Sequence, residues 1–305
     1  MNAASPPPVT AAAIAPVADA EGCILCGASL ERLTERKSTC FLACPRCGLM
    51  IGRSSAGKGD AVVETDPQHF KLLVEQYPAY RGVARRLIEA RLPVYRRHLG
   101  RDPGYWLEIG PGNGALGEIL PALGCEWIGV EFDADMASFM TQSGKCVVHA
   151  DFAEVDPAAL MTDEVRANGG FDIVSFSQVL EHVLRPRAFL ANALAALRPG
   201  GLVHIDVPNG AGLTAAIRRL NPLSASYGEI VPPHHMIAYS ARSLRTALEG
   251  AGFDIVDLFD CAYDHPVFGL VHSHMSASGK LRAVWKLSSI VGGGGNLVAL
   301  ARRPS

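Results

Sequence analysis

The most regular feature of the chain is an alternation of short apolar runs with longer amphipathic segments, from about residue 105 onward. Apolar runs of this length predict strands, and the segments between them have helical spacing. Strands that alternate with helices form βαβ units, so the pattern predicts an α/β fold with a doubly wound, mostly parallel, seven-stranded sheet. The runs are YWLEIG, CEWIGVE, CVVHAD, FDIVSFSQ, GLVHIDVP, FDIVDLFD and NLVALARR.

The remaining segments differ from the sheet region in composition. The N-terminus is rich in Ala and Pro, and a cysteine-rich stretch follows it. Helical spacing then returns, with predicted breaks at Pro78 and Pro93. The predicted organisation is a disordered tail over 1–20, a cysteine-rich module over 21–52, a helical extension over 60–100, and the sheet domain over 101–305 with insertions at about 209–240 and 264–295.

Charge and hydropathy narrow the classes of partner. The net charge of −2 gives no basic field, which disfavours nucleic acid as a partner. The chain has no uninterrupted apolar run of about twenty residues, so we expect no membrane span. The N-terminal stretch lacks a charged and apolar signal sequence, and we therefore expect a cytoplasmic location. An oligomer is left open.

The cysteine-rich stretch has the spacing of a metal site. CILC and CPRC form a C-x2-C-x17-C-x2-C pattern, and a glycine follows each pair. Four thiolates on two tight turns can close a tetrahedral zinc site with no position for water, which predicts a structural ion. An unmetallated thiol cluster is the alternative. The predicted ligands are Cys23, Cys26, Cys44 and Cys47, with Cys40 as a spare thiol.

A glycine-rich loop follows the first predicted strand in WLEIGPGNGALG. A strand before it and a helix after it are the context in which such loops bind nucleotides. Glu131 ends the next strand, where a carboxylate can bind ribose hydroxyls. A nicotinamide dinucleotide and S-adenosylmethionine both offer that ribose. Glu108, two residues before Gly110, would repel a pyrophosphate and attract an ammonium and a sulfonium, which favours S-adenosylmethionine.

The order of several motifs then resembles one family. LEIGPGNG, the acids Glu131 and Asp151, SFSQVLEHV, LRPGG and the closing GGGGNLVALARRP resemble the class I S-adenosylmethionine-dependent methyltransferases, which have a Rossmann-like fold. The resemblance implies that Glu131 binds the ribose and Asp151 the adenine amine, with an aromatic ring beside it. The cofactor-binding residues that we expect are Glu108, Gly110, Gly112, Asn113, Gly114, Glu131, Phe132, Asp151, Phe152, Ser177, Gln178 and Glu181.

The histidines near the carboxyl edge of the sheet are candidates for chemistry. An acceptor hydroxyl or carbon acid needs a base, and histidine suits that role near neutral pH. We favour His235 as the base, because it lies in the insertion that follows the fifth strand and faces the acceptor. His182 is the second candidate catalytic residue; a structural role beside the cofactor's methionine is its alternative.

The sequence indicates the methyl acceptor less clearly than it indicates the cofactor. A zinc-ribbon-like module ahead of this core resembles the subset of the family that methylates sugars and natural-product intermediates. The leading hypothesis is therefore a small-molecule methyltransferase that acts on oxygen, or less readily carbon, of a sugar, a polysaccharide intermediate or a secondary metabolite. The alternatives are an RNA or protein methyltransferase that docks through the zinc module, a non-catalytic scaffold of the same fold, and a nicotinamide oxidoreductase.

Overall fold

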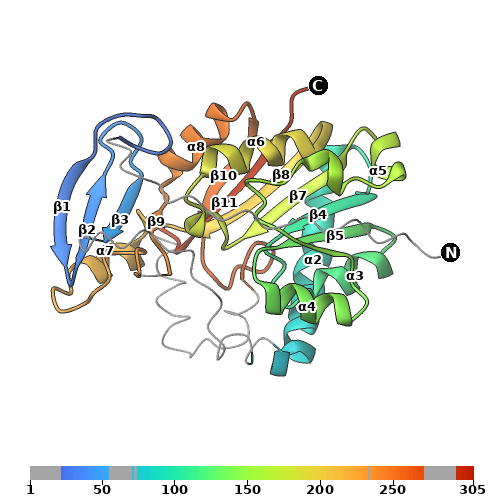
Figure 1. Cartoon of the computed structure of the whole chain (residues 1–305), viewed down its shortest axis with the longest axis horizontal. Coiled ribbons are helices and arrows are strands. Elements are labelled where there is room, and N and C mark those ends of the chain that lie inside the picture. The colour runs from blue at the N-terminus through green and yellow to red at the C-terminus, as the bar shows by residue number, and fades with distance from the viewer. Residues whose placement is uncertain (1–21, 55–70, 72–73, 233, 271–292) are drawn as a thin grey trace.

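The structure of the chain is a computed structural model (Figure 1). It describes residues 22–54, 71, 74–232, 234–270 and 293–305. The predicted tail over 1–20 and most of the predicted insertion over 264–295 lie outside the described residues.

A seven-stranded sheet forms the centre of the molecule, and the predicted fold class is confirmed. The strands follow the order β10-β11-β8-β7-β4-β5-β6, and all neighbours are parallel except those of β11, which is antiparallel to β8 and to β10. All seven predicted runs form strands. Their bounds are β4 (Tyr105–Ile109), β5 (Glu126–Glu131), β6 (Val147–His149), β7 (Phe171–Ser177), β8 (Leu197–Pro208), β10 (Asp254–Cys261) and β11 (Asn296–Arg302).

Helices cover both faces of the sheet, because successive side chains of each buried strand point to opposite sides. Trp106 and Ile173 pack with α2 and α3, whereas Leu107 and Val174 pack with α5, α6 and α8 (Figure 1). The helical elements are α2 (Tyr77–Leu99), α3 (Leu116–Ala122), α4 (Ala134–Gln142), η1 (Pro157–Leu160), α5 (Asp163–Ala167), η2 (Leu180–His182), α6 (Pro186–Ala196), α7 (Leu213–Arg219) and α8 (Ala241–Gly250).

Helix α2 differs from the prediction at one proline. Pro78 lies in its first turn, where a missing N–H is tolerated, but the predicted break at Pro93 is wrong because the helix continues through it. Ile88 and Tyr95 are buried on either side of Pro93, and the Tyr95 hydroxyl lies 2.5 Å from His204 Nδ1. Tertiary packing therefore outweighs the lost hydrogen bond. In the described part of the chain, no helix is both long and apolar enough to cross a bilayer.

The cysteine-rich module and the first insertion form one unit. Strands β1 (Glu31–Arg36), β2 (Thr39–Ala43) and β3 (Met50–Ser54) make an antiparallel sheet, and β9 (Ile237–Ala238) from the insertion adds a fourth strand (Figure 1). Met50 pairs with Ala238 and Ile51 with Ile237. Residues separated in sequence by five strands of the central sheet therefore lie in one small sheet.

Candidate active site and cysteine cluster

The predicted glycine loop runs from the end of β4 to the start of α3. Gly110, Gly112 and Gly114 have φ values of 64°, 57° and 70°, which L side chains rarely adopt. A Cβ at Gly110 would lie 2.7 Å from a methyl group of Val179, and one at Gly114 would lie 2.7 Å from the sulfur of Met140. A Cβ at Gly112 would meet no atom within 4 Å, so the loop is open on that side. The chain can therefore turn sharply here and leave its backbone accessible.

Two carboxylates lie beside this loop. The Trp127 indole donates a hydrogen bond to Glu108 at 2.9 Å, and the Asp133 amide donates one to Glu131 at 2.9 Å. The pKa of Glu108 is raised to about 8, first by burial and then by the charge of Glu131. Burial also raises the pKa of Glu131, to about 7. Because a nearby positive charge would favour both ionised forms, this pair of acids fits a cationic ligand.

The predicted adenine-binding residues follow β6. Asp151 forms an ion pair with Arg185 at 2.8 Å. The Phe152 ring is buried and meets Phe189 edge-on, with ring centroids 5.0 Å apart, so it belongs to the core. Phe132 is 40% exposed and is the phenylalanine with free surface for a base. The adenine contacts of Asp151 and Phe152 stay predictions.

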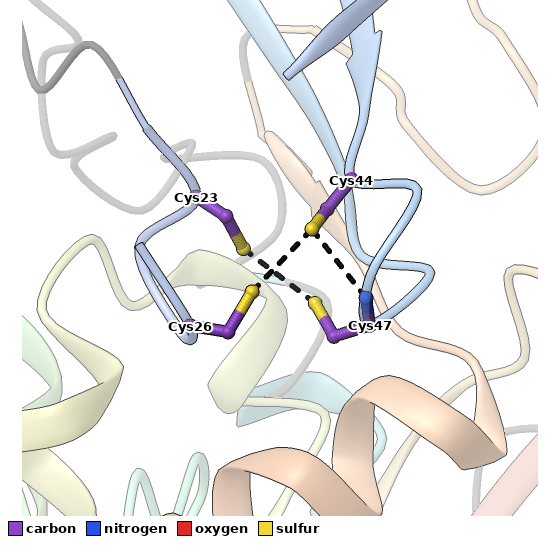
Figure 2. A group of neighbouring side chains, drawn as sticks. All are labelled: Cys23, Cys26, Cys44 and Cys47. Atoms are coloured by element: carbon purple, nitrogen blue, oxygen red, sulfur yellow. Dashed lines mark hydrogen bonds between the residues drawn. The ribbon is translucent and has the colours of Figure 1, made fainter. Parts of the chain in front are cut away.

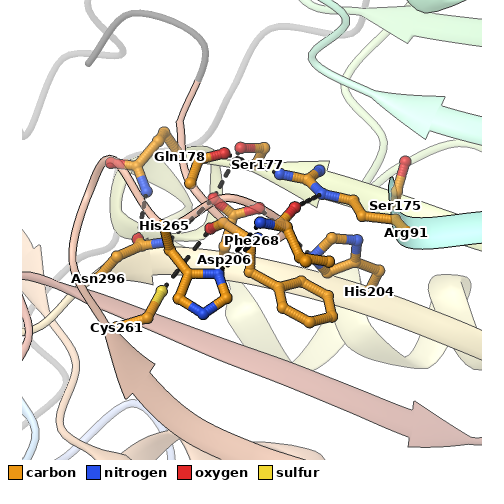
Figure 3. A network of polar contacts seen from close by, with 12 residues as sticks. Arg91, Ser175, Ser177, Gln178, His204, Asp206, Cys261, His265, Phe268 and Asn296 are labelled. Atoms are coloured by element: carbon orange, nitrogen blue, oxygen red, sulfur yellow. Dashed lines mark hydrogen bonds and ion pairs between the residues drawn. The ribbon is translucent and has the colours of Figure 1, made fainter. Parts of the chain in front are cut away.

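Ser177 and Gln178 belong to a polar network at the end of β7, which reaches the buried side chains of Asp206 and Asn296 (Figure 3). Ser177 Oγ donates to Asp206 at 2.9 Å, and Gln178 Nε2 donates to Asn296 at 3.1 Å. This network holds Gln178 in a left-handed conformation with φ of 55°. Sequence reasoning missed Asp206 and Asn296. The signal available for Asp206 was an acid inside the otherwise apolar run GLVHIDVP.

Glu181 and His182, which are adjacent in η2, come together with His235 from the later insertion. Each offers one ligand atom, and these atoms lie within 4.8 Å of one another. The two imidazole rings are 4.7 Å apart and nearly perpendicular. Glu181 is buried, His235 is half-buried and His182 is exposed. We call these three residues the Glu–His cluster.

Burial favours the neutral forms of Glu181 and His235. Burial raises the pKa of Glu181 to about 8. The pKa of His235 is lowered to about 4, first by burial and then by the neighbouring His182. His235 is therefore neutral near pH 7 and has a lone pair to offer.

The four predicted metal ligands form a compact group at the base of the module (Figure 2). The sulfur atoms of Cys23 and Cys47 are 3.5 Å apart, as are those of Cys26 and Cys44. A tetrahedral zinc site with 2.3 Å bonds has sulfur atoms about 3.8 Å apart, so the group has the size for one ion. Cys40 lies outside the group. We call Cys23, Cys26, Cys44 and Cys47 the cysteine cluster.

Tight turns bring the four thiols together. The Gly27 amide donates to the Cys23 carbonyl at 2.8 Å, and the Gly48 amide donates to the Cys44 carbonyl at 2.8 Å. Both glycines have positive φ values, of 73° and 78°. The glycine after each pair is thus required by the turn that aims its two sulfur atoms inward.

The two clusters are neighbours in one core. Cys23 and Cys47 pack in the same apolar cluster as Tyr239, which follows β9. Tyr239 is fully buried, and its pKa is raised first by burial and then by the charges of Glu181, Cys23 and Cys47. The module therefore packs close to the Glu–His cluster. His235 lies two residues before β9, the strand that pairs with β3 of the module.

Comparison with known sequences identifies a family model. The model described as a methyltransferase domain matches residues 79–258, which is more than half of the chain. A ubiquinone biosynthesis O-methyltransferase of Paramagnetospirillum magneticum is 31% identical over 130 residues, which cover 38% of this chain and 50% of that protein. One of the same name from Parvibaculum lavamentivorans is 36% identical over 109 residues, which cover 34% of this chain and 40% of that protein. The matches thus span about half of these relatives.

Solved structures share the fold at low identity. A chain in the complex between the Haloferax volcanii Trm112 methyltransferase activator and a methyltransferase aligns with a TM-score of 0.50 and 14% identity, over 80% of this chain and 100% of that one. A SAM-dependent methyltransferase from Archaeoglobus fulgidus aligns with a TM-score of 0.47 and 23% identity, over 72% and 94% of the chains.

Proposed function

The chain belongs to the methyltransferase-domain family that it matches, and we propose that its methyl acceptor is a hydroxyl group of a small molecule. The family assignment and the seven-stranded sheet make it an S-adenosylmethionine-dependent methyltransferase. The acceptor proposal is carried by one observation: the acidic glycine loop and the Glu–His cluster lie together, because Val179 contacts Gly110 and leads directly into η2.

The residues beside the glycine loop fit S-adenosylmethionine. Glu131 would bind the ribose hydroxyls, as expected for an acid at the end of the second strand of the sheet. Glu108 would face the cationic methionine end, where a positive charge stabilises its ionised form. Gly112 leaves space for the ligand to approach the backbone. The nicotinamide alternative is disfavoured, because a pyrophosphate would lie against these two acids.

The Glu–His cluster forms the proposed acceptor end of the site. S-adenosylmethionine supplies an activated methyl group, so the chain has mainly to align the two reactants and to promote loss of the acceptor proton. His182 is exposed and His235 is half-buried, and both can meet a ligand that enters from solvent. We propose that His235 promotes loss of that proton, because it is neutral near pH 7 and belongs to the insertion beyond β8.

We also propose that the cysteine cluster holds one structural Zn²⁺ ion. The four thiols fill all the positions of a tetrahedral ion, so such an ion would have none left for a reactant. Its role would be to hold the two tight turns of the module together, and through β3 and β9 to support the insertion that presents His235.

The acceptor proposal has two chemical classes. The module favours a sugar or a natural-product intermediate by its resemblance to that subset of the family. The names of the matched relatives, which are O-methyltransferases of ubiquinone biosynthesis, favour a hydroxylated intermediate of that kind of pathway. Both classes offer an O–H group, which a neutral histidine could help to deprotonate.

Transfer of a labelled methyl group tests the acceptor. The full chain is incubated with labelled S-adenosylmethionine and, separately, with nucleotide sugars, catechols, total RNA and a protein extract. We expect label in an O-methylated small molecule and none above background in RNA or protein. Label in RNA or protein at a higher rate than in any small molecule would replace the small-molecule proposal with the docking alternative.

A further inference from the structure

We propose that Glu181, His182 and His235 bind one divalent cation, and that this cation also binds the acceptor oxygen. The role in methyl transfer rests on the proposed function, whereas binding of the cation does not. The proposal depends on the positions and partners of three side chains, which are described in turn.

Glu181 has the first property of a ligand, a buried carboxylate with no partner. Its side chain is 1% exposed, and neither oxygen has a hydrogen-bond partner among the residues that the structure describes. An unpaired buried polar group destabilises a fold, so such groups normally have partners or bind an ion. One ligand atom from each of His182 and His235 lies within 4.8 Å of a carboxylate oxygen of Glu181. A cation bound between Glu181 and the two histidines would give the buried carboxylate its missing partner.

His182 has its ring oriented for coordination. Its Nδ1 lies 2.7 Å from the backbone carbonyl of His234, and this contact requires the proton on Nδ1 because a carbonyl only accepts. The other nitrogen, Nε2, then carries a lone pair. A hydrogen bond from one ring nitrogen to a backbone carbonyl is the arrangement that fixes the tautomer of metal-binding histidines.

His235 supplies the third ligand atom. Its Nδ1 is buried and has no hydrogen-bond partner in the described part of the chain. Its ring is perpendicular to that of His182 at a centroid distance of 4.7 Å, so the two rings do not stack and one edge of each can face a shared point. Each of the three residues thus offers one ligand atom, and these atoms lie within 4.8 Å of one another.

This donor set selects the kind of ion. Two imidazoles and one carboxylate are the ligands of catalytic zinc and of non-haem iron sites, and they also accept Mn²⁺. The cysteine cluster offers four soft thiolates instead, so the two sites prefer different ions. Three protein ligands leave positions open, and the exposed side of His182 gives access to them. The site therefore has room for a reactant as well as an ion.

An ion at this position would activate a hydroxyl group. Its charge lowers the pKa of a bound hydroxyl, whose proton leaves to solvent water, and the resulting oxygen anion is the stronger nucleophile for a methyl group. His235 would then promote proton loss as a ligand and not as the base itself. An acceptor with two adjacent oxygens, such as a catechol or a vicinal diol, could fill two open positions and would be preferred over a single hydroxyl.

Binding of Mn²⁺ tests the site directly. The full chain is dialysed against a chelator, its remaining metal is counted by elemental analysis, and Mn²⁺ binding is followed by electron paramagnetic resonance. Mn²⁺ is a poor ion for thiolates, so it reports on the Glu–His cluster. We expect one bound Mn²⁺ per chain, at least tenfold weaker binding in Glu181→Gln and His235→Ala, and wild-type binding in the matched control His234→Ala.

The outcomes separate this proposal from the proposed function. The cation site would be overturned if the wild-type chain binds no Mn²⁺ and retains at most one metal ion, which the cysteine cluster would account for. Equal Mn²⁺ binding by the wild type, Glu181→Gln and His235→Ala would also overturn it. Methyl transfer at an undiminished rate in the metal-free chain would overturn the role of the ion and leave the methyltransferase proposal standing. Failure of S-adenosylmethionine to bind, measured by calorimetry, would instead reject the proposed function whatever the Mn²⁺ result. Circular dichroism checks the fold of each variant, and His235→Ala alone suffices if Glu181→Gln is unfolded.

Discussion

The cysteine cluster and the Glu–His cluster lie in one core but are built in opposite ways. Each cysteine sulfur faces another sulfur at about the separation of ligands on a shared ion. In the Glu–His cluster, the Glu181 carboxylate is buried without a hydrogen-bond partner among the described residues, and His182 faces solvent. In the cysteine cluster, four thiols would fill every position of a tetrahedral ion. In the Glu–His cluster, three side chains would leave coordination positions open. The difference separates a site that holds the fold from one that can hold a reactant.

Local sequence produces the first arrangement and tertiary structure the second. Both cysteine pairs sit on turns closed by hydrogen bonds within five residues, such as that from the Gly27 amide to Cys23. Glu181 and His235 meet only because the insertion returns to the end of β7 and pairs with β3. A site of the second kind can change its chemistry when the insertion changes, without altering the turns that hold the first.

Loss of the zinc site should have the largest effect. Structural zinc binding contributes on the order of 10 kcal/mol to small metal-bound domains, and Cys44→Ser removes one of four ligands. We expect less than half of one zinc per chain by elemental analysis and a marked fall in the melting temperature. The control Cys40→Ser removes a thiol outside the cluster and should retain both. Full zinc in Cys44→Ser would show that the cysteine cluster is not the site.

Removal of His235 should change turnover and spare the zinc. His235→Ala is expected to lower single-turnover methyl transfer by roughly 10²–10⁴, the range for loss of assistance to proton removal. Zinc content and S-adenosylmethionine affinity should stay near those of the wild type, because His235 lies at the acceptor end. His234→Ala is the matched control. Normal turnover in His235→Ala would show that the Glu–His cluster does not assist methyl transfer through His235.

Glu131 should determine cofactor affinity independently of both clusters. Charge-assisted hydrogen bonds contribute about 1.5–3 kcal/mol each, so Glu131→Ala should weaken S-adenosylmethionine binding at least tenfold by calorimetry. Burial raises the pKa of Glu131 to about 7, and the ionised form is the one that accepts charge-assisted hydrogen bonds from the ribose hydroxyls. Wild-type affinity should therefore rise from pH 6 to pH 8, and this rise should shrink in Glu131→Ala. An unchanged affinity in the variant would refute the assignment.

The smallest effect is expected at the tyrosine between the clusters. The Tyr239 hydroxyl is buried and has no hydrogen-bond partner in the described residues. Because Tyr239→Phe removes an unpaired polar group and keeps the ring, the free energy of unfolding should stay the same or rise by about 1 kcal/mol. Denaturant unfolding measures it. A loss of more than 1 kcal/mol would mean that the hydroxyl has a partner, and the two clusters would then be coupled through it.

The sequence predicts elements whose cause is local. All seven strands were predicted because buried strands read as short apolar runs between turns. The glycine loop was predicted because the positive φ values of Gly110, Gly112 and Gly114 favour glycine. The cysteine cluster follows from a spacing that two tight turns impose.

Features that depend on distant segments were missed. Strand β9 is two residues long and forms because β3 offers an edge, so no periodic pattern marks it. Pro93 predicted a break that buried neighbours override. Asp206 and Asn296 meet Ser177 and Gln178 only after three strands are side by side. The meeting of Glu181 with His235 is of the same kind, since no spacing in the sequence encodes it.

The pairing of β3 with β9 has a consequence for building chimeric enzymes. The boundary of the exchangeable unit is set by the four-stranded sheet and not by the order of residues along the chain. If only the module is taken from a related enzyme, its β3 must pair with a β9 of different sequence. If only the insertion is taken, its β9 must pair with a β3 of different sequence. Acceptor preference should therefore be transplanted as a matched pair of segments, residues 22–54 together with 209–240. Recombination at those two places would exchange the segments proposed to present the acceptor and keep the glycine loop proposed to bind the methyl donor.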